Sequence, residues 1–188
     1  MPVASIRPAR PDDVEPIAAL HVTAWLETYR GLLAEAVIAS RDVAARRAQW
    51  GARLDAPPPG SAMFVAEEPE GAIVAFGACG RQRDPSLAFP GEFHGLYILR
   101  RAQRAGIGRA LMRAMATSML GHGLGGASLW VLRGNLAARA FYTELGGAQV
   151  AARETPEMGA EVAFAWHDLR TLIASPGRSM VDEPARPS

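Results

Sequence analysis

The sequence predicts one α/β domain, of the α+β kind, built on a mixed sheet with flanking helices. Short apolar runs with the two-residue alternation of strands are interspersed with longer runs of helical spacing. Their order is strand, two helices, three strands, helix, strand, helix and two strands, which is typical of helices packed on a mixed sheet of roughly six to seven strands. The chain has 188 residues, of which 49% are hydrophobic and 21% charged, enough for one soluble globular domain. We expect this domain to span residues 1–173, and residues 174–188, which have little to bury, to form a disordered tail.

The composition excludes several classes of site. A formal net charge of +1 argues against wholesale nucleic-acid binding. All 20 basic residues are arginines, so the sequence excludes a catalytic lysine. Cys79 is the single cysteine, which rules out an internal disulfide and a multi-cysteine zinc site, and we expect no metal. We find no secretory pattern and no membrane-spanning run, so a cytoplasmic protein with no membrane partner is the default expectation.

The N-terminal third predicts a strand and two helices. A short polar–apolar stretch at residues 6–10 suits an edge strand. Asp12, with Glu15 three residues later, predicts a capped helix start. His21 lies in the apolar stripe of that helix, so we expect a packed, hydrogen-bonded histidine. A second helix is expected over residues 41–54.

The middle of the chain predicts a hairpin followed by a central strand. Two alternating apolar runs, at residues 62–67 and 72–79, are joined by the turn sequence EPEG. Cys79 ends the second run and is expected to be a small buried apolar residue. The next strand covers residues 93–99, and a helix with apolar residues on one face starts at about Gly108.

The junction between that strand and that helix carries the first functional signal. Gly106 and Gly108 allow the backbone to bend and to approach a ligand closely. The free N–H groups of a helix N-terminus attract an anion, and a phosphate suits them best. Four arginines add positive charge around the turn: Arg100, Arg101, Arg104 and Arg109. An ordinary strand-to-helix turn with a solvated basic rim is the alternative.

A second glycine-rich stretch, GHGLGG at residues 121–126, matches the G-x-G-x-x-G pattern of dinucleotide-binding proteins. That pattern functions after a strand and before a helix, whereas here a helix precedes it and a strand follows. We therefore interpret these glycines as the helix end and a turn.

Two blocks of the sequence resemble the GNAT superfamily of N-acetyltransferases. Residues 103–108, QRAGIG, are similar to the Q/R-x-x-G-x-G/A loop that binds the acetyl-CoA pyrophosphate in that family. Residues 129–147, LWVLRGNLAARAFYTELGG, resemble the later block of strand, Asn, helix with Phe-Tyr, and glycine step. The resemblance covers residues 4–170 and implies a mostly antiparallel sheet whose two central strands splay apart around the pantetheine arm.

The resemblance also implies the residues that bind acetyl-CoA and perform the transfer. The expected cofactor-binding residues are Tyr97, Ile98, Leu99, Gln103, Arg104, Ala105, Gly106, Ile107, Gly108, Arg109, Asn135 and Tyr142. Asn135 also suits an ordinary helix N-cap. The predicted catalytic residues are Tyr142, as the acid that protonates the leaving thiolate, and Glu92, as the general base. Because side chains alternate along a strand, His94 and Leu96 should share a face with Glu92. His94 is therefore a second candidate base, and ordered water a third.

The acceptor is less well defined by the sequence. The resemblance places the first two helices and their connecting loop beside the acceptor, so Trp25, Glu27 and Tyr29 are candidate substrate-binding residues. His94, on the central strand near Glu92, is a fourth candidate. Aromatic residues that merely cover the sheet are the alternative for Trp25 and Tyr29. Glu27 would suit a cationic amine. We expect an enzyme that acetylates a primary amine of a small molecule or a peptide N-terminus. A non-catalytic acyl-CoA sensor is the alternative, and the acyl chain length and a homodimeric state are open.

Overall fold

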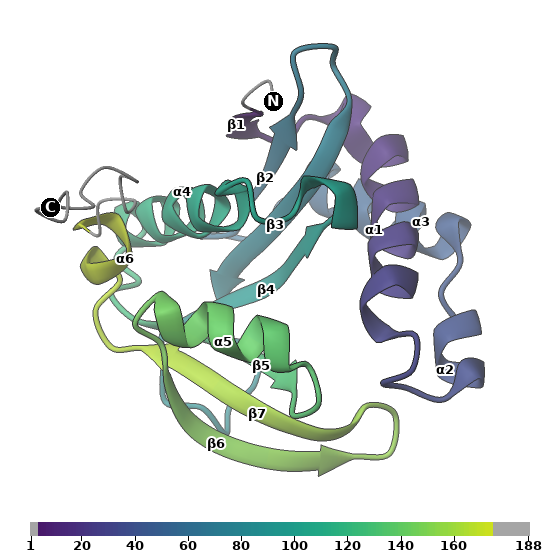
Figure 1. The fold of residues 1–188 in the computed structure, drawn as a ribbon. Helices are drawn as coiled ribbons and strands as arrows, with labels where there is room; N and C mark the ends of the chain where they lie inside the picture. The colour runs from purple at the N-terminus through teal and green to yellow at the C-terminus, as the bar shows by residue number, and fades with distance from the viewer. Residues whose placement is uncertain (1–3, 175–188) are drawn as a thin grey trace, which may run out of the picture.

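The structure is a computed structural model that describes residues 4–174, in which seven strands form one sheet of order β1-β2-β3-β4-β5-β7-β6 (Figure 1). The strands are β1 (Ser5–Pro8), β2 (Ala62–Glu67), β3 (Ile73–Arg81), β4 (Gly91–Ile98), β5 (Ala127–Leu132), β6 (Ala148–Thr155) and β7 (Gly159–Trp166). β4 and β5 pair in parallel, and the other neighbours pair antiparallel. The mostly antiparallel mixed sheet expected from the sequence is confirmed.

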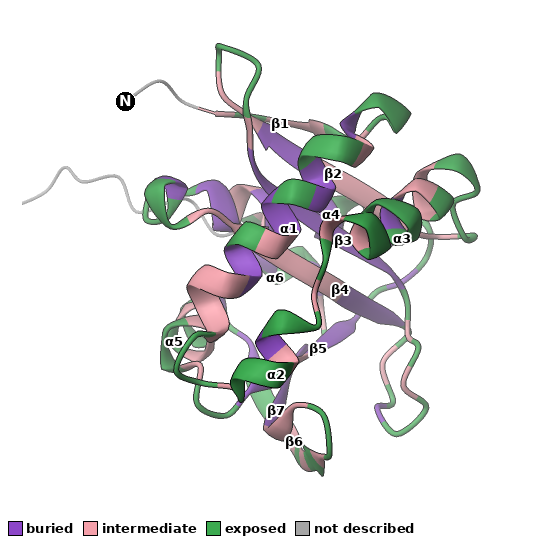
Figure 2. Ribbon diagram, turned by 90° about the vertical axis from the view of Figure 1, so that its right-hand side faces the viewer, coloured by how far each residue is buried: buried purple, intermediate pink, exposed green. Residues whose placement is uncertain are grey.

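Helices cover both faces of this sheet (Figures 1 and 2). The helices are α1 (Val14–Tyr29), α2 (Glu35–Ala39), α3 (Val43–Asp55), α4 (Ile107–Gly121), α5 (Leu136–Glu144) and α6 (Arg170–Ala174). The buried side of α1 and the indole of Trp50 on α3 pack on one face of β2 and β3. The methionine-rich side of α4, together with Tyr142 and Leu145 of α5, covers the other face. The two layers therefore place α1 and α4 on opposite sides of β4.

Most of the predicted elements are present, with corrections at their ends. Asp12 does not cap α1; it lies in a 3-10 turn, Pro11–Asp13, and it is Asp13 that accepts a hydrogen bond from the N–H of Arg10 at 2.7 Å. Asp13 also pairs with Arg7 of β1, which holds the pKa of that carboxyl below its usual value. The alternation of the sequence predicts the last two strands over residues 148–152 and 161–168; both extend farther toward their connecting turn, β6 to Thr155 and β7 from Gly159, and β7 ends at Trp166. The sequence did not predict α2 or α6.

The β4–β5 pair is where the sheet opens. Only two residue pairs join the strands, Gly91 with Ala127 and Glu92 with Ser128, although β4 has eight residues and β5 has six. Beyond Glu92 the two strands diverge, so the expected splay of the central strands is confirmed. The N–H and C=O groups along the facing edges then lack strand partners, which is a costly arrangement unless another group bonds to them.

A β-bulge at His94 changes which side chains share a face of β4. Gly95 is opposite Ala78 and Phe93 is opposite Cys79, so His94 has no partner on β3. The expectation that Leu96 shares a face with Glu92 is wrong for this reason, because an extra residue shifts the alternation. Leu96 packs on the α4 side, whereas His94 remains close to Glu92, with 4.0 Å between Nε2 and Oε2.

Two further sequence-based expectations concern the C-terminal tail and membrane-spanning helices. Of the predicted tail, residues 175–188 lie outside the described residues, whereas Ala174 is the last residue of α6, so the tail was predicted to begin one residue too early. Among residues 4–174, no helix combines the length and apolarity needed to cross a bilayer.

Candidate active site

Residues 103–108, called the glycine loop below, lead from β4 into α4 with an unusual backbone. Gly106 has φ +79° and Arg104 has φ +63°, both in the left-handed region. No side chain caps α4. Within the described chain, the backbone N–H groups of residues 104–109 donate to no other protein group. Successive unpaired N–H groups with alternating handedness form a concave anion-binding surface, and the helix dipole adds to its positive potential.

Gly108 fixes the position of this loop between β4 and α5. A Cβ at Gly108 would lie 3.0 Å from Phe141 Cζ and 3.1 Å from Ile98 Cδ1, so only glycine fits without movement of these side chains. Gln103 donates from Nε2 to the carbonyl oxygen of Ile98 at 3.1 Å. These contacts hold the first turn of α4 against the open end of β4.

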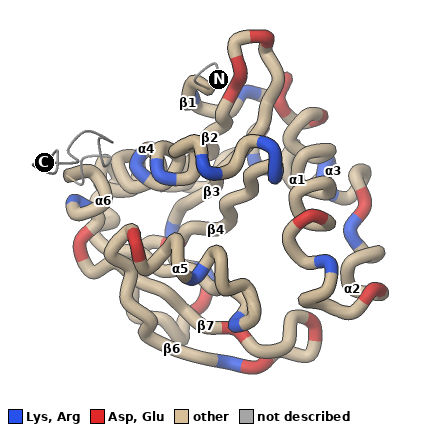
Figure 3. Tube along the Cα trace, viewed as in Figure 1, with Lys and Arg blue, Asp and Glu red and all other residues tan. Residues whose placement is uncertain are grey.

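Most of the arginines around the glycine loop are already paired. Arg101 makes a bidentate ion pair with Glu68, and Arg109 pairs with Glu144 at 2.8 Å. Figure 3 shows basic segments along α4 and the preceding loop. Within residues 4–174 Arg104 has no ion-pair or hydrogen-bond partner, so its guanidinium is available to an anion at the loop. A groove of about 500 Å³ lies along α4 on the side of β1 and β2, and Ile6, Phe64, Gly106, Arg109 and Arg113 contribute to its lining.

Of the three residues whose backbone is expected to pair with the cofactor, Tyr97, Ile98 and Leu99, Ile98 has its N–H at the open edge of β4. The N–H of Leu99 donates to Val74 of β3 at 3.0 Å. Because backbone groups alternate between the two edges of a strand, the N–H of Ile98 points toward β5 instead. Ile98 is therefore the residue at which an amide-rich ligand could extend the sheet. Across the gap, Asn135 caps α5 by accepting from the N–H of Ala138 at 3.2 Å, and within the described chain its own NH₂ group donates to no residue.

Tyr142 reaches the gap from α5. Its ring packs against Phe164 and Trp166 and is 8% exposed. Among residues 4–174, no group bonds to its hydroxyl. Burial raises its pKa well above the usual value for tyrosine, and Tyr97 adds to the shift. Tyr142 therefore stays protonated at neutral pH, as a proton donor must.

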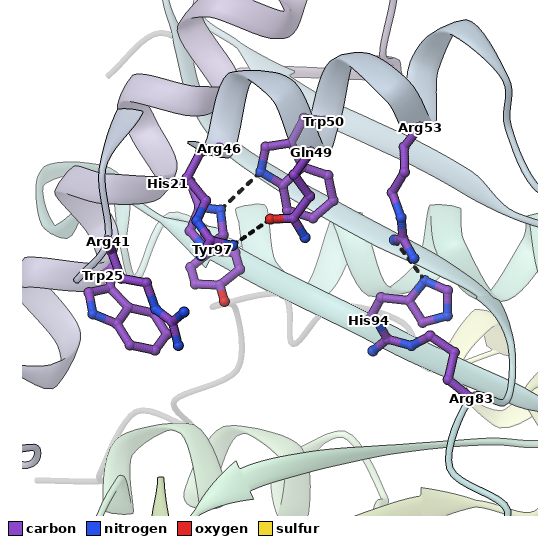
Figure 4. A pocket seen from close by; sticks show the side chains of 10 residues that line it. All are labelled: His21, Trp25, Arg41, Arg46, Gln49, Trp50, Arg53, Arg83, His94 and Tyr97. Atoms are coloured by element: carbon purple, nitrogen blue, oxygen red, sulfur yellow. Dashed lines mark hydrogen bonds between the residues drawn. The ribbon is translucent and has the colours of Figure 1, made fainter. Parts of the chain in front are cut away.

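On the α1 side of β4 lies a cavity of about 140 Å³, called the arginine pocket below (Figure 4). Its lining comes from α1, α3, β4 and the segments before α3 and β4. The residues are His21, Trp25, Arg41, Arg46, Gln49, Trp50, Arg53, Arg83, His94 and Tyr97. Four of the ten are arginines, and none is acidic.

The two histidines of the arginine pocket are neutral at physiological pH. His21 Nδ1 accepts from Trp50 Nε1 at 2.9 Å, and burial, with Arg46 and Arg41, lowers the pKa of His21 to about 3. The packed, hydrogen-bonded histidine expected at this position is confirmed. His94 Nδ1 lies 3.1 Å from Arg53 Nη1, which donates to it, and Nε2 donates to the Arg81 carbonyl. Burial and the nearby Arg83 lower the pKa of His94 to about 4. A weakly basic nitrogen that already accepts a guanidinium hydrogen bond is a poor general base.

Glu92 lies at the closed end of the β4–β5 gap. Its carboxylate is 6% exposed and accepts from both the backbone N–H and the guanidinium of Arg83. An arginine of the β3–β4 loop thus holds this carboxylate in place at the point where the strands begin to separate.

The three other candidate substrate residues have different surroundings. Trp25 packs against Tyr29, with 4.2 Å between ring centroids, and lines the arginine pocket. Burial raises the pKa of Tyr29, and nearby Tyr97, Tyr142 and Glu161 add to the shift, so Tyr29 faces the gap. The Glu27 carboxylate instead accepts from the N–H of Arg100 at 2.7 Å and ties α1 to the turn after β4.

Comparison with known proteins places this architecture in a family. The profile of the acetyltransferase (GNAT) family matches residues 19–147, which is more than half of the chain and includes the glycine loop, β4 and α5. The chain belongs to the GNAT family.

Similar proteins agree with this assignment. The chain is 29% identical to the uncharacterized N-acetyltransferase YuaI of Bacillus subtilis, over 89% of this chain and 95% of that protein. Among solved structures, PaiA N-acetyltransferase of Thermoplasma acidophilum, in complex with coenzyme A, has a TM-score of 0.68 at 19% identity. That likeness covers 85% of this chain and 97% of PaiA. For yncA of Salmonella typhimurium, solved with acetyl-CoA, the TM-score is 0.67 at 20% identity, and 98% of each chain is covered.

This GNAT protein is an acetyl-CoA-dependent N-acyltransferase, and acetyl-CoA is its acyl donor. The unpaired N–H groups of residues 104–109 and the open edge at Ile98 fit the pyrophosphate and the pantetheine of that donor. No group of three or more His, Cys, Asp or Glu side chains suited to a metal ion occurs within residues 4–174.

Sequence reasoning missed the arginines of the arginine pocket. Arg46, Gln49 and Arg53 recur at three- and four-residue spacing on α3, which places them on one face of the helix. That spacing was available as a signal, but only the packing of α3 against α1, with Arg53 reaching His94 of β4, shows that this face is turned toward the sheet rather than toward solvent. Arg41 and Arg83 come from loops and carried no such signal.

Proposed function

We propose that this enzyme transfers the acetyl group of acetyl-CoA to a primary amine of a small molecule or peptide N-terminus by direct attack. The observation that carries the proposal is the convergence, at the open end of β4, of a free Ile98 N–H, the Tyr142 hydroxyl and the arginine pocket. A pure cofactor-binding module has no need of a proton donor or of a second pocket on the opposite face.

Acetyl-CoA supplies the reactive carbonyl: a C–N bond forms to the amine, the C–S bond breaks, and the thiolate leaves. The Ile98 N–H, unpaired at the edge of β4, stabilises negative charge on the carbonyl oxygen. The protonated hydroxyl of Tyr142 gives its proton to the departing sulfur. The amine loses its own proton to water or, through water, to Glu92.

In this proposal Glu92 acts as the base at a distance and His94 does not act as one. The Glu92 carboxylate lies 4.0 Å from the His94 ring, at the point where β4 and β5 begin to diverge. Its bonds to Arg83 fix its position, which suits a group that receives a proton through a water chain.

Thiol release from acetyl-CoA tests the proposal. The acceptor panel contains simple amines, amino acids, polyamines, aminoglycosides and peptides with free N-termini. Wild type is compared with Tyr142→Phe and Glu92→Gln. Turnover with one class of amine, lowered in both variants, supports the proposal. Saturable acetyl-CoA binding without turnover on any acceptor overturns it in favour of a sensor.

A further inference from the structure

The arginine pocket holds positive charge that the protein does not neutralise. Within residues 4–174, two of its four arginines have a carboxylate partner: Arg83 pairs with Glu92, and Arg41 pairs with Glu157 at 2.6 Å. The Glu157 side chain is 63% exposed, so water screens much of that pair. The other two arginines, Arg46 and Arg53, have no acidic partner in the described chain.

The polar contacts of Arg46 and Arg53 inside the pocket are to neutral groups. Arg46 donates to the amide oxygen of Gln49, and Arg53 donates to His94 (Figure 4). Burial, followed by the charge of Arg83, lowers the pKa of Arg53 from its usual value. Guanidinium groups remain charged in proteins, so Arg46 and Arg53 place positive charge in the pocket that no paired carboxylate of the described chain balances. The nearby carboxylate, that of Glu92 beside His94, is already bonded to Arg83.

Two buried donors of the same cluster are unsatisfied. The Nε atoms of Arg41 and Arg46 are shielded from solvent and have no hydrogen-bond partner. A buried N–H without an acceptor destabilises the fold, because it loses its hydrogen bond to water and gains none in the protein. An oxyanion in the pocket would accept from such groups and would also balance the charge of Arg46 and Arg53.

The size and position of the pocket restrict the ligand further. A volume of about 140 Å³ is below the roughly 300–1,000 Å³ of drug-sized ligand sites, so it suits one small group. Tyr97 lines the pocket, and the next residue of β4, Ile98, presents its N–H to the gap. A molecule whose anionic end lies in the pocket therefore extends toward the reacting carbonyl.

We propose that the acceptor is a small amine that also carries an oxyanion, a carboxylate or a phosphonate, and that Arg46 and Arg53 bind this group. The inference rests on the proposed acetyl transfer to an amine. In that reaction the free amino end of the molecule forms the new C–N bond, while the anionic end is unchanged. Polyamines and aminoglycosides, which are cationic throughout, are repelled by the same arginines.

Matched acceptor pairs test this inference. Each amino acid is compared with its carboxamide and with the corresponding aminophosphonate, and kcat/KM is measured for all three by thiol release. We expect the amino acid or the aminophosphonate to exceed the carboxamide by about tenfold or more, since the loss of a charge-assisted contact costs about that much. The better of the two anions identifies the oxyanion.

Variants of the pocket assign the preference to its arginines. In Arg46→Gln and Arg53→Gln the ratio of anionic to carboxamide kcat/KM should fall by about tenfold, mainly through KM, whereas the carboxamide itself changes little. Arg53→Lys, which keeps the charge, should retain part of the preference. Arg47→Gln is the matched control, because Arg47 is exposed on the same helix and pairs with Glu15 outside the pocket.

The failures of the two proposals are distinguishable. Absence of turnover with every acceptor, despite acetyl-CoA binding, defeats the proposed function itself. Turnover in which carboxamides, polyamines or peptide N-termini equal or exceed the anionic amines defeats the present inference alone. An equal loss of preference in Arg47→Gln would also contradict it, because the effect would then be one of general charge. Thermal melting of each variant shows whether it is folded.

Discussion

The glycine loop and the arginine pocket lie on opposite sides of β4 and offer anions quite different groups. The loop presents backbone N–H groups of residues 104–109, positioned by left-handed residues and the tight contact at Gly108. The pocket presents guanidinium groups that converge from α3 and from the segments before α3 and β4. Backbone N–H groups survive every substitution except one to proline, whereas side chains can be exchanged one at a time. The difference suggests that the loop serves the donor common to the family, and that the pocket distinguishes one acceptor from another.

The largest expected effect lies between these two regions, at Tyr142. In Tyr142→Phe we expect kcat to fall by about 100-fold to 1,000-fold, because a general acid contributes on this order. Binding of acetyl-CoA and the melting temperature should change little, since no described group bonds to the hydroxyl. Stopped-flow thiol release measures kcat, and calorimetry measures acetyl-CoA binding and the melting temperature. Tyr29→Phe, on the acceptor side, is the comparison, and an equal loss there would contradict the assignment.

The loop is tested by Gly108→Val. The added side chain meets Phe141 and Ile98 at distances already near 3 Å, so the first turn of α4 must move away from β4. Overpacking costs about 1–3 kcal/mol, so we expect acetyl-CoA to bind about 10-fold to 100-fold more weakly in calorimetric titration. Gly121→Ala, at the far end of α4 with no atom near its Cβ position, is the matched control. Undiminished binding by Gly108→Val would show that the loop does not hold the cofactor.

Neutral histidines of the arginine pocket should make the protein sensitive to acid. The pKa of His21 is lowered to about 3, so the unfolded chain takes up this proton more readily than the folded one. Stability is therefore lost as pH falls from about 6.5 toward 3, by on the order of 3 kcal/mol between pH 7 and pH 4. In His21→Gln, which keeps an acceptor for Trp50 Nε1, this dependence should be reduced by that amount. Denaturant unfolding at several pH values measures it, and parallel curves for the two proteins would refute the explanation.

The smallest effect is expected at Glu27, which was a candidate for acceptor binding. Because its carboxylate bonds to the N–H of Arg100, Glu27→Gln should change the acceptor KM by less than about threefold. Steady-state kinetics measured on Glu27→Gln and Arg46→Gln in parallel compare the change in acceptor KM between the two variants. A larger loss in Glu27→Gln than in Arg46→Gln would move the acceptor site from the pocket to the end of α1.

The parts of the site that sequence reasoning predicted are local ones. Gly106 and Gly108 are adjacent to the helix that they begin, and the Asn135 cap acts within four residues. The bulge at His94 could not be predicted, because residues 92–96 look like regular alternation until β3 is placed beside them. The five-residue helices α2 and α6 are too short for a periodic signal.

The arginine pocket could not be predicted for a different reason. Its lining is contributed by separate segments that meet only through packing, and an arginine on a helix is most often a solvated one. Glu27 shows how a local reading of charge leaves out such packing. Its charge appeared suited to an amine, but the fold uses it to fix the turn after β4.

The most direct test of the division between the two regions is a calorimetric titration of acetyl-CoA into the double variant Arg46→Gln/Arg53→Gln. If the loop binds the donor and the pocket binds the acceptor, the variant will bind acetyl-CoA with the wild-type dissociation constant while it loses its preference for anionic amines. A dissociation constant weakened as much as in Gly108→Val would contradict the account, because the arginine pocket would then belong to the cofactor.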